Sequence, residues 1–285
     1  MSSTRSSPLM SPEQLAESLS RPDLVVLDIR ANAPFEAGHV PGAVLSDYAA
    51  DGWRVARGSA GGLLPDADAL AALVGRLGLR PDHHAVVVSA GAGANDFNAA
   101  ARVYWTLKVA GHSPVSLLDG GYAGWTGDPA RPVEAGPARA RAATTYPVRL
   151  DKRLRAELAE VERAVAGGSA TLVDARSEAA FEGREKSPQA RVGGRLPGAL
   201  LADVTDAYDW ATNRLRPRDE LQRVFAKVPE GEAISYCNTG HSAAGDWFVL
   251  SEVLRRPGVK LYDGSMSEWT QDPSSPVETG PGRKP

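Results

Sequence analysis

The chain has 285 residues and a formal net charge of −3, which gives no electrostatic reason to expect nucleic acid or an anionic membrane as a partner. No apolar run approaches the ~20 residues that a membrane-spanning helix needs, and Met1 to Met10 lack the apolar core of a secretory signal. The single cysteine excludes an internal disulfide, so we expect a cytoplasmic protein in a reducing environment.

The first half of the chain predicts helices and strands in alternation. Ser11 followed by Pro12 is typical of a helix start, with Ser as the N-cap and Pro at the first helical position. Beyond this helix, the pattern predicts a strand at Leu24–Leu27, a helix from Pro65 to Leu77, a strand at Ala85–Val88, a helix over Ala99–Val109 and a strand at Val115–Leu118.

The second half predicts a similar succession. It consists of a helix over Arg153–Ala166, a strand at Thr171–Val173, a helix over Arg218–Phe225, a strand at Ala233–Tyr236, a helix over Ser242–Leu254 and a strand at Lys260–Tyr262. Short apolar strands between amphipathic helices predict an α/β fold, in which a parallel sheet is covered by helices on both faces. Ligands of such sheets bind at the carboxyl ends of the strands.

Short motifs occur twice in the same order and divide the chain into two homologous domains. Each half has an Asp-x-Arg segment, a Pro-Gly-Ala turn and a closing Asp-Gly-x-x-x-x-Trp segment. The copies are Asp28–Arg30 with Asp174–Arg176, Pro41–Ala43 with Pro197–Ala199, and Asp119–Trp125 with Asp263–Trp269. We therefore expect an N-terminal domain at residues 8–137, a linker at 138–145 and a C-terminal domain, which alone contains the cysteine, at 146–281.

Cys237 lies between a predicted strand, Ala233–Tyr236, and a predicted helix that begins at Ser242. A thiol at this place is near the unpaired N–H groups and the positive end of the helix dipole, which stabilise an anion. Such surroundings lower the pKa of a thiol and favour the reactive thiolate. A lone cysteine is more often an inert core residue, but this setting favours a reactive one.

Taken together, these motifs resemble those of the tandem rhodanese-domain sulfurtransferases, the family of thiosulfate and 3-mercaptopyruvate sulfurtransferases. The resemblance extends from about Ser11 to Gly280 and includes a cysteine loop in the second half only. It implies two rhodanese-like domains, of which the C-terminal one is catalytic.

The resemblance also implies a mechanism. The thiolate of Cys237 takes a sulfane sulfur from a small donor as a persulfide, and a thiol, thioredoxin or cyanide then accepts it. The N–H groups of the loop are expected to point at the sulfur, as an anion-binding nest does. Gly240 suits such a loop because glycine adopts positive φ without a Cβ clash. We expect no cofactor. The expected loop residues are Asn238, Thr239, Gly240, His241 and Ser242.

The loop composition bears on the choice of donor. In the family, thiosulfate-selective loops carry basic residues directly after the cysteine, whereas mercaptopyruvate-selective loops carry small residues, with a serine two positions after it. Here Thr239 occupies that position and His241 is the one possible cation, which favours mercaptopyruvate. Asp47 matches the aspartate of the family's Cys-Ser-Asp constellation.

Two family residues are missing. The arginine that usually precedes the aromatic residue of the second repeat is replaced by Ala180, and Gly62 lies near the place of the family's histidine before a Leu-Pro segment. We expect Arg184 or Arg191, which lie in the insertion after the aromatic residue, to contact the donor anion instead.

Other polar residues have a structural interpretation. Asp28 with Arg30 and Asp174 with Arg176 occur in both halves although one half lacks the cysteine, so each pair predicts a buried ion pair or a turn-fixing network. Arg176 is also a candidate for lining the site. The histidines at positions 83–84 have no further His or Cys nearby, so we expect no metal site there.

Two further segments belong to the repeat. His39, whose counterpart is Arg195, predicts a local hydrogen bond. The Gly91–Gly93 run lacks the Lys-Ser/Thr and the spacing of a nucleotide-binding loop. We interpret it as the counterpart of the cysteine loop, with Ser89 or Ala90 in the place of the cysteine.

Two other classes of function are compatible with a reactive cysteine. A cysteine phosphatase needs an arginine six residues after the cysteine to bind phosphate, whereas position 243 is Ala, so that class is disfavoured. A non-enzymatic persulfide carrier in a protein sulfur relay stays open. Such a relay would turn over protein persulfide but neither thiosulfate nor mercaptopyruvate.

Overall fold

The computed structural model describes residues 6–139 and 141–282, which fold into two compact units. Unit 1 consists of the chain up to Trp53, Pro65–Asp151 and Trp210–Leu215. Unit 2 consists of Arg54–Leu64, Lys152–Asp209 and the chain from Arg216 on. The units differ from the boundaries expected from the repeats because two short segments, 54–64 and 210–215, pack with the unit of the other repeat.

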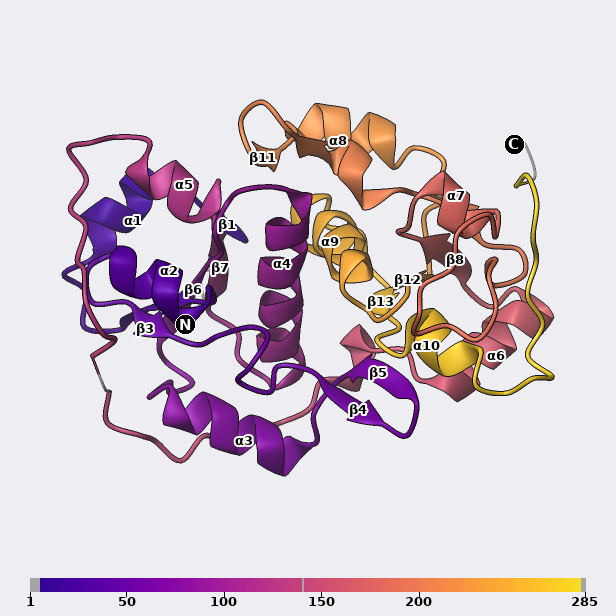
Figure 1. Ribbon diagram of the computed structural model, residues 1–285, viewed down its shortest axis with the longest axis horizontal. Helices are drawn as coiled ribbons and strands as arrows, with labels where there is room; N and C mark the ends of the chain where they lie inside the picture. Colours follow the sequence, from indigo (N-terminus) through magenta and orange to yellow (C-terminus); the bar gives the residue numbers. More distant parts are fainter. Residues whose placement is uncertain (1–5, 140, 283–285) are drawn as a thin grey trace. The chain divides into compact units, whose positions relative to one another are not determined.

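Unit 1 contains a five-stranded sheet in the order β1-β7-β6-β2-β3, in which all neighbouring strands pair in parallel (Figure 1). Its core includes Phe35 and Trp125, both fully buried. The elements of unit 1 are β1 (Leu9–Met10), α1 (Pro12–Ser18), β2 (Leu24–Asp28), α2 (Asn32–Ala37), β3 (Val44–Leu45), α3 (Ala67–Arg76), β6 (His84–Val88), α4 (Ala94–Val109), β7 (Val115–Leu118), α5 (Gly121–Thr126) and β11 (Arg214–Leu215).

Unit 2 contains a four-stranded parallel sheet in the order β13-β12-β8-β9. The predicted parallel α/β architecture is thus confirmed in both units. The elements that the second repeat contributes are η1 (Lys152–Leu154), α6 (Leu158–Gly167), β8 (Thr171–Asp174), α7 (Glu178–Phe181), β9 (Leu200–Leu201), η2 (Val204–Ala207), β10 (Tyr208–Asp209), α8 (Arg218–Val224), β12 (Ala233–Tyr236), α9 (Ser242–Trp247), the π-helix η3 (Phe248–Val253), β13 (Val259–Leu261) and α10 (Ser265–Trp269).

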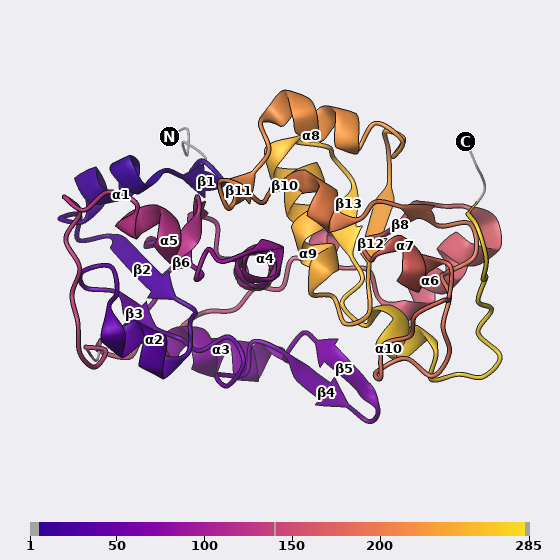
Figure 2. The same cartoon turned by 45° about the horizontal axis from the view of Figure 1, so that its top comes forward.

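A hairpin from the first repeat completes unit 2. Its antiparallel strands are β4 (Val55–Arg57) and β5 (Ala60–Leu63). Figures 1 and 2 show from two directions that this hairpin lies against α10, which begins directly after the turn that follows β13. The periodicity of the sequence did not predict this hairpin, because its strands are short, glycine-rich and stabilised by contacts with a distant segment.

The predicted helix start at Ser11 is confirmed. The Ser11 hydroxyl accepts a hydrogen bond from the backbone N–H of Gln14, 3.2 Å away, and the Gln14 side chain accepts one from the N–H of Ser11, 2.9 Å away. This reciprocal capping box satisfies two backbone donors that the helix itself leaves unpaired.

Two predicted helix bounds were wrong. The helix expected from Arg153 begins only at Leu158, because Arg155 forms a parallel bridge with Leu261 and the N–H of Ala156 donates to the carbonyl of Leu261, 2.9 Å away. The edge of β13 thus holds this segment outside the helix. In unit 1, α4 begins at Ala94 rather than Ala99, directly after the glycine-containing loop.

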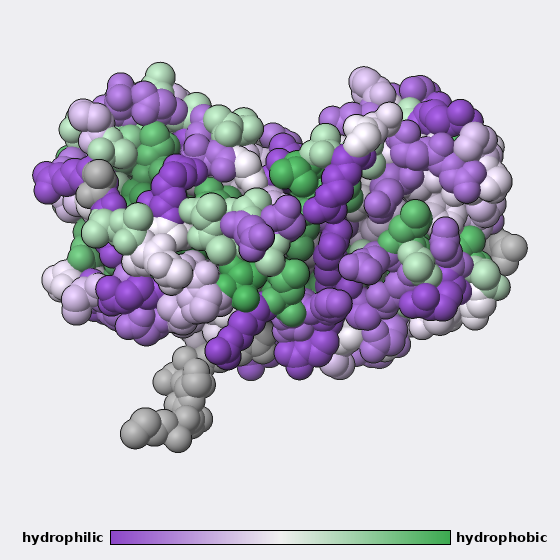
Figure 3. Space-filling model, turned by 90° about the horizontal axis from the view of Figure 1, so that it is seen from below, coloured by the Kyte–Doolittle hydropathy of each residue, from purple (hydrophilic) through white to green (hydrophobic). Residues whose placement is uncertain are grey.

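No helix in the described part of the chain is long and apolar enough to cross a membrane. Hydrophilic residues are spread over much of the face drawn in Figure 3 and interrupt the hydrophobic patches there. Within the described residues, four large hydrophobic side chains are exposed, at Val133, Leu150, Val192 and Trp210.

Candidate active site

Three neighbouring strands of unit 2 end at the site. β12 lies between β8 and β13, with Tyr236 opposite Asp174 and Ser235 opposite Leu261. Because the strands are parallel, the residues that follow them meet at one edge of the sheet. Arg176, Cys237 and Ser265 follow β8, β12 and β13 respectively, so distant parts of the sequence form one site.

Cys237 is a free thiol, and 2% of its surface is exposed. Its backbone carbonyl accepts a hydrogen bond from the N–H of Met266, 3.1 Å away, and the next carbonyl, of Asn238, accepts one from the N–H of Ser267, 2.9 Å away. The first residues of α10 therefore hold the start of the cysteine loop.

The Ser265 side chain binds the backbone of the cysteine loop at two places. Its hydroxyl oxygen accepts hydrogen bonds from the N–H groups of Cys237 and Gly240, 3.0 and 3.1 Å away, and donates to the carbonyl of Tyr262, 2.8 Å away. The expectation was that the loop N–H groups point at the sulfur. These two bond to Ser265 instead, because its hydroxyl lies inside the curl of the loop.

The backbone of Ser265 is strained. Its φ is +50°, a left-handed conformation that costs a non-glycine residue on the order of 1–3 kcal/mol, and its side chain is fully buried. Sequence reasoning did not identify this residue. The available signal was the difference between the two closing segments, in which Gly121 occupies the place of Ser265.

The rest of the loop agrees in part with expectation. Gly240 has a φ of +68°, which confirms the predicted positive φ. His241 directly precedes α9 and Ser242 is its first residue. Thr239 is buried, and Gly62 of the β4–β5 hairpin lies against it so closely that a Cβ at position 62 would be 2.7 Å from the Thr239 Cβ.

Arg176 connects the loop to β8. Its guanidinium donates to Asp174 at 2.8 and 2.6 Å, to the carbonyl of Gly194 at 2.8 Å and to the side-chain oxygen of Asn238 at 3.3 Å. Burial lowers the pKa of Arg176, but the hydrogen bond and charge of Asp174 outweigh burial and raise the pKa above its usual range. The Arg176 guanidinium is therefore a fixed cation beside the loop.

The ion pair predicted from the repeated Asp-x-Arg segment is confirmed in both units. In unit 1, Arg30 donates to Asp28 at 2.7 Å and to the carbonyl of Gly38 at 2.7 Å, just as Arg176 donates to Asp174 and Gly194. Both pairs are buried. The shared pair fixes the turn after the strand, whereas the contact with Asn238 belongs to the catalytic repeat.

Within unit 2, the described contacts of Arg184 do not include the loop. Arg184 is more than half exposed and pairs with Glu182 and Glu178, 2.8 and 3.7 Å away. Asp47 belongs to unit 1, where its carboxylate accepts the backbone N–H of Ala49, 2.8 Å away.

The structure identifies the counterpart of the cysteine. In unit 1, Ser89 follows β6, and its carbonyl accepts the N–H of Tyr122, 2.8 Å away, as the carbonyl of Cys237 accepts that of Met266. Ser89, and not Ala90, therefore occupies the place of the cysteine. The predicted local hydrogen bond of His39 is also confirmed, because its Nδ1 lies 2.9 Å from the carbonyl oxygen of Phe35.

A buried carboxyl group lies in the helix after the loop. Asp246, in α9, is fully buried, and neither of its carboxyl oxygens has a hydrogen-bond partner within the described residues. Burial, assisted by the charges of Asp203 and Asp174, raises the pKa of Asp246 well above its usual range. These surroundings therefore favour the neutral form of the Asp246 carboxyl group.

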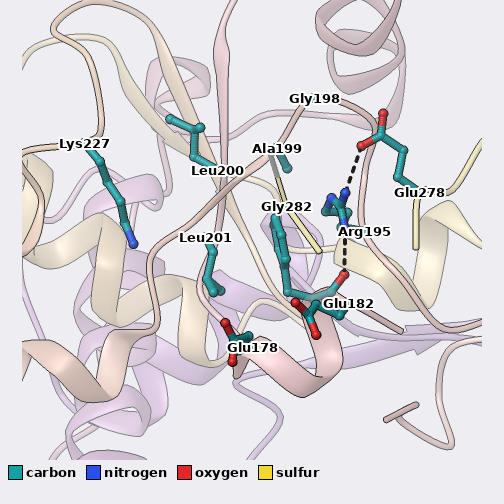
Figure 4. Close-up of a pocket in the computed structure, with 11 residues that line it drawn as sticks. Glu178, Glu182, Arg195, Gly198, Ala199, Leu200, Leu201, Lys227, Glu278 and Gly282 are labelled. Atoms are coloured by element: carbon teal, nitrogen blue, oxygen red, sulfur yellow. Dashed lines mark hydrogen bonds and ion pairs between the residues drawn. The ribbon is translucent and has the colours of Figure 1, made fainter. Parts of the chain in front are cut away.

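A cavity of unit 2, of about 410 Å³, is lined by none of the cysteine-loop residues (Figure 4). Arg195 lines this cavity. Its guanidinium lies 3.3 Å from the carboxylate of Glu278, and its Cζ lies 4.4 Å from the centre of the Phe181 ring. The residues that line it are Glu178, Phe181, Glu182, Arg195, Gly198, Ala199, Leu200, Leu201, Lys227, Glu278 and Gly282. Among the described residues, no group of three or more His, Cys, Asp or Glu side chains is arranged to hold a metal ion.

Known proteins share both the sequence and the architecture. The family model described as "Rhodanese-like domain" matches residues 11–128 and 157–272 of this chain. A thiosulfate sulfurtransferase of Corynebacterium glutamicum is 33% identical over 97% of this chain and 92% of its own length. A probable 3-mercaptopyruvate sulfurtransferase of Pseudomonas aeruginosa is also 33% identical, over 96% of this chain and 99% of its own length.

A solved structure agrees with these matches. The crystal structure of SseA from Escherichia coli, whose description refers to 3-mercaptopyruvate sulfotransferases, has a TM-score of 0.77 and 27% identity. The similarity covers 91% of this chain and 99% of that one. The two matched ranges and the full-length similarity agree with the repeat found in the sequence.

Proposed function

The chain belongs to the family of rhodanese-like domains and is a sulfurtransferase, and we propose that Cys237 carries the transferred sulfur as a persulfide taken from 3-mercaptopyruvate. The observation that carries this proposal is the position of Cys237. It lies at the carboxyl end of β12, in a loop whose backbone is held by Ser265, Met266 and Ser267.

The reaction has two covalent steps. The thiolate of Cys237 attacks the sulfur of the donor, and the carbon–sulfur bond of mercaptopyruvate breaks with its electron pair left on carbon. Protonation of that carbon gives pyruvate, and the sulfur stays on the enzyme as a persulfide. A nucleophilic acceptor then attacks the outer sulfur, and the sulfur–sulfur bond breaks to restore the Cys237 thiolate.

The surrounding residues have separate roles in this proposal. Arg176, paired with Asp174, fixes the start of the loop by donating to the side-chain oxygen of Asn238, 3.3 Å away. The Ser265 hydroxyl keeps the loop curled by accepting hydrogen bonds from the N–H groups of both Cys237 and Gly240. Asn238, Thr239, His241 and Ser242 remain candidates for contact with the donor.

The preference for mercaptopyruvate rests on charge. The loop from Cys237 to Ser242 contains no Lys or Arg, and the guanidinium of Arg176 is already paired with Asp174. The doubly charged thiosulfate therefore forgoes a charge-assisted hydrogen bond, worth on the order of 1.5–3 kcal/mol. That energy corresponds to about one to two decades in catalytic efficiency.

The acceptor and the cellular location complete the proposal. We propose a thiol, thioredoxin or cyanide as the acceptor, because each is a nucleophile able to attack the outer sulfur. The cytoplasm is the proposed location, since a persulfide enzyme with a single free thiol suits a reducing compartment.

A steady-state comparison of the two donors, with cyanide as acceptor, tests the proposal. We expect kcat/KM to be at least tenfold higher for mercaptopyruvate. A clear preference for thiosulfate would contradict the choice of donor, and turnover of neither donor would favour the protein relay. In the same assay, Arg184→Ala tests the donor contact predicted for that residue, which requires a raised donor KM without a change in the acceptor step.

A further inference from the structure

We infer that the β4–β5 hairpin positions the persulfide loop, and that position 62 requires glycine because its backbone lies directly against Thr239. The inference rests on the sulfurtransferase function proposed above, in which the loop holds the transferred sulfur. It assigns a role in the active site to a segment of the repeat that has no cysteine.

The contact leaves no space for a side chain. Gly62 has a φ of +86°, and a Cβ built on it would lie 2.7 Å from the Cβ of Thr239 and closer still to the Thr239 carbonyl oxygen. Contacts under 3.0 Å are essentially absent for real Cβ atoms, and here the nearest atom belongs to the backbone, which cannot rotate away. Any larger residue at position 62 must therefore displace the hairpin or the loop.

The hairpin is anchored on both sides of Gly62. On one side, the Ser267 hydroxyl donates to the carbonyl of Gly61, 2.8 Å away. On the other, the N–H of Leu64 donates to the carboxylate of Asp263, 2.6 Å away, which Arg155 holds in turn at 2.7 Å. With both neighbours fixed, the hairpin resists displacement and a clash at position 62 is transmitted to Thr239.

Ser267 links the hairpin to the loop directly. Its hydroxyl binds the hairpin at Gly61, and its backbone N–H donates to the carbonyl of Asn238, 2.9 Å away. Thr239 lies between Asn238 and Gly240, and Gly240 is bonded to Ser265. A shift of Thr239 therefore strains both neighbours and moves the loop relative to the sulfur, and a misplacement of about 1 Å lowers a reaction rate severely.

Gly62→Ala tests the inference, with Gly52→Ala as the matched control. Gly52 has nearly the same φ, +88°, but a Cβ there meets nothing within 4 Å, so both variants carry the same backbone strain and only one carries the clash. We expect the rate of persulfide formation in single-turnover mixing with donor to fall at least tenfold in Gly62→Ala. It should stay within about twofold of wild type in Gly52→Ala.

The final number of sulfur atoms added per chain distinguishes a misplaced loop from a partly unfolded protein. Mass spectrometry should show that the variant still reaches one added sulfur per chain, but slowly. A variant that is merely unstable would instead contain a smaller competent fraction that reacts at the wild-type rate. Equal rates in Gly62→Ala and Gly52→Ala would overturn the inference. Failure of wild type to form a persulfide would overturn the proposed function instead.

Ser267→Ala keeps the test valid if Gly62→Ala does not fold. This change removes the bond to Gly61, together with the bond of the same hydroxyl to the carbonyl of Gly264, and adds no clash, so we expect a smaller, several-fold fall in the same rate. Ser274→Ala is its control, because the exposed Ser274 hydroxyl bonds only to Asp272 among the contacts that the structure describes. Unchanged persulfide formation in Ser267→Ala would count against the hairpin as a positioning element.

Discussion

The cysteine loop of unit 2 and the corresponding loop of unit 1 follow equivalent strands but are closed in different ways. In unit 2, the Ser265 hydroxyl lies inside the loop and accepts two of its N–H groups. In unit 1, Gly121 occupies that place, and a Cβ on it would lie 2.7 Å from the carbonyl oxygen of Ser89. The loop of unit 1 packs directly against backbone, whereas the loop of unit 2 curls around the Ser265 side chain.

The two loops share the contacts that do not depend on chemistry. Both have a buried Asp–Arg pair after the neighbouring strand, and both accept hydrogen bonds from the helix after the last strand. The active loop additionally has the hydroxyl, the contact of Arg176 with Asn238, and the hairpin at Gly62. We therefore expect activity to depend on these added features as well as on the cysteine.

The largest expected effect comes from Cys237 itself. Cys237→Ser should abolish sulfur transfer and leave the fold intact, because a serine hydroxyl cannot form a persulfide. Transfer of the thiol to the other loop, by Ser89→Cys in the Cys237→Ser background, should not restore turnover, since that loop is closed on Gly121. Sulfur transfer to cyanide measures both. Turnover by Cys237→Ser would contradict the role of Cys237 as the sulfur carrier, and turnover restored by Ser89→Cys would show that the two loops differ less than the structure indicates.

Converting the active loop toward the inactive one should have the next largest effect. Ser265→Gly removes the hydroxyl that accepts two N–H groups of the loop, so we expect the loop to lose its curl and kcat/KM to fall about 10–100-fold, which corresponds to roughly 1.4–2.7 kcal/mol in the activation barrier. Relief of the positive-φ strain offsets part of the cost of the two unpaired N–H groups, so the thermal midpoint should fall by less than it does in Ser265→Ala.

Ser265→Ala is the control for the previous prediction. It removes the same hydroxyl but keeps a Cβ at positive φ, so we expect a similar activity and a lower thermal midpoint than for Ser265→Gly. Differential scanning calorimetry and donor kinetics measure the two effects separately. Wild-type activity in Ser265→Gly would show that the hydroxyl does not shape the loop.

The units should also differ in their response to acid. In unit 1, burial, with a smaller contribution from His83, lowers the pKa of His112 to about 4. The neutral ring lies 2.9 Å from the hydroxyl of Tyr146, and His84 and Lys108 are the other charged groups that act on it. Because the folded pKa is below the unfolded value of 6.5, this stability is complete above pH 6.5 and decreases as the pH falls toward 4.

As the pH falls from 7 to below 4, the free energy of unfolding should decrease by about 3 kcal/mol in total because of His112. In His112→Gln, urea denaturation at pH 7, 5.5 and 4 should show a smaller decrease in the free energy of unfolding than in wild type. An identical acid slope in the two proteins would exclude His112 as its source.

Asp246 of unit 2 should show the opposite dependence on pH. Its folded pKa is raised, so its contribution is fully present below the unfolded pKa of 3.8 and is lost as the pH rises through the folded pKa. Asp246→Asn cannot ionise and should therefore gain thermal stability relative to wild type as the pH increases, by roughly 2–4 °C per kcal/mol. A difference in thermal midpoint that does not change between pH 5 and pH 9 would contradict this assignment.

Much of the fold follows from sequence patterns, because apolar strands and helix caps are local signals. The N-cap at Ser11 and the strand Ala233–Tyr236 were both predicted from neighbouring residues alone. The β4–β5 hairpin and the late start of α6 at Leu158 were not, because contacts with distant residues decide them.

The site shows the same division. The sequence by itself determined the two repeats, the place of Cys237 after a strand and the paired Asp-x-Arg segments, since each depends on residues close together in the chain. Only the tertiary structure placed Ser265 inside the loop and Gly62 against Thr239, because three parallel strands and a hairpin from the other repeat must assemble before these residues meet. Such contacts are decided by the space left between packed backbones, and spacing along the chain does not encode it.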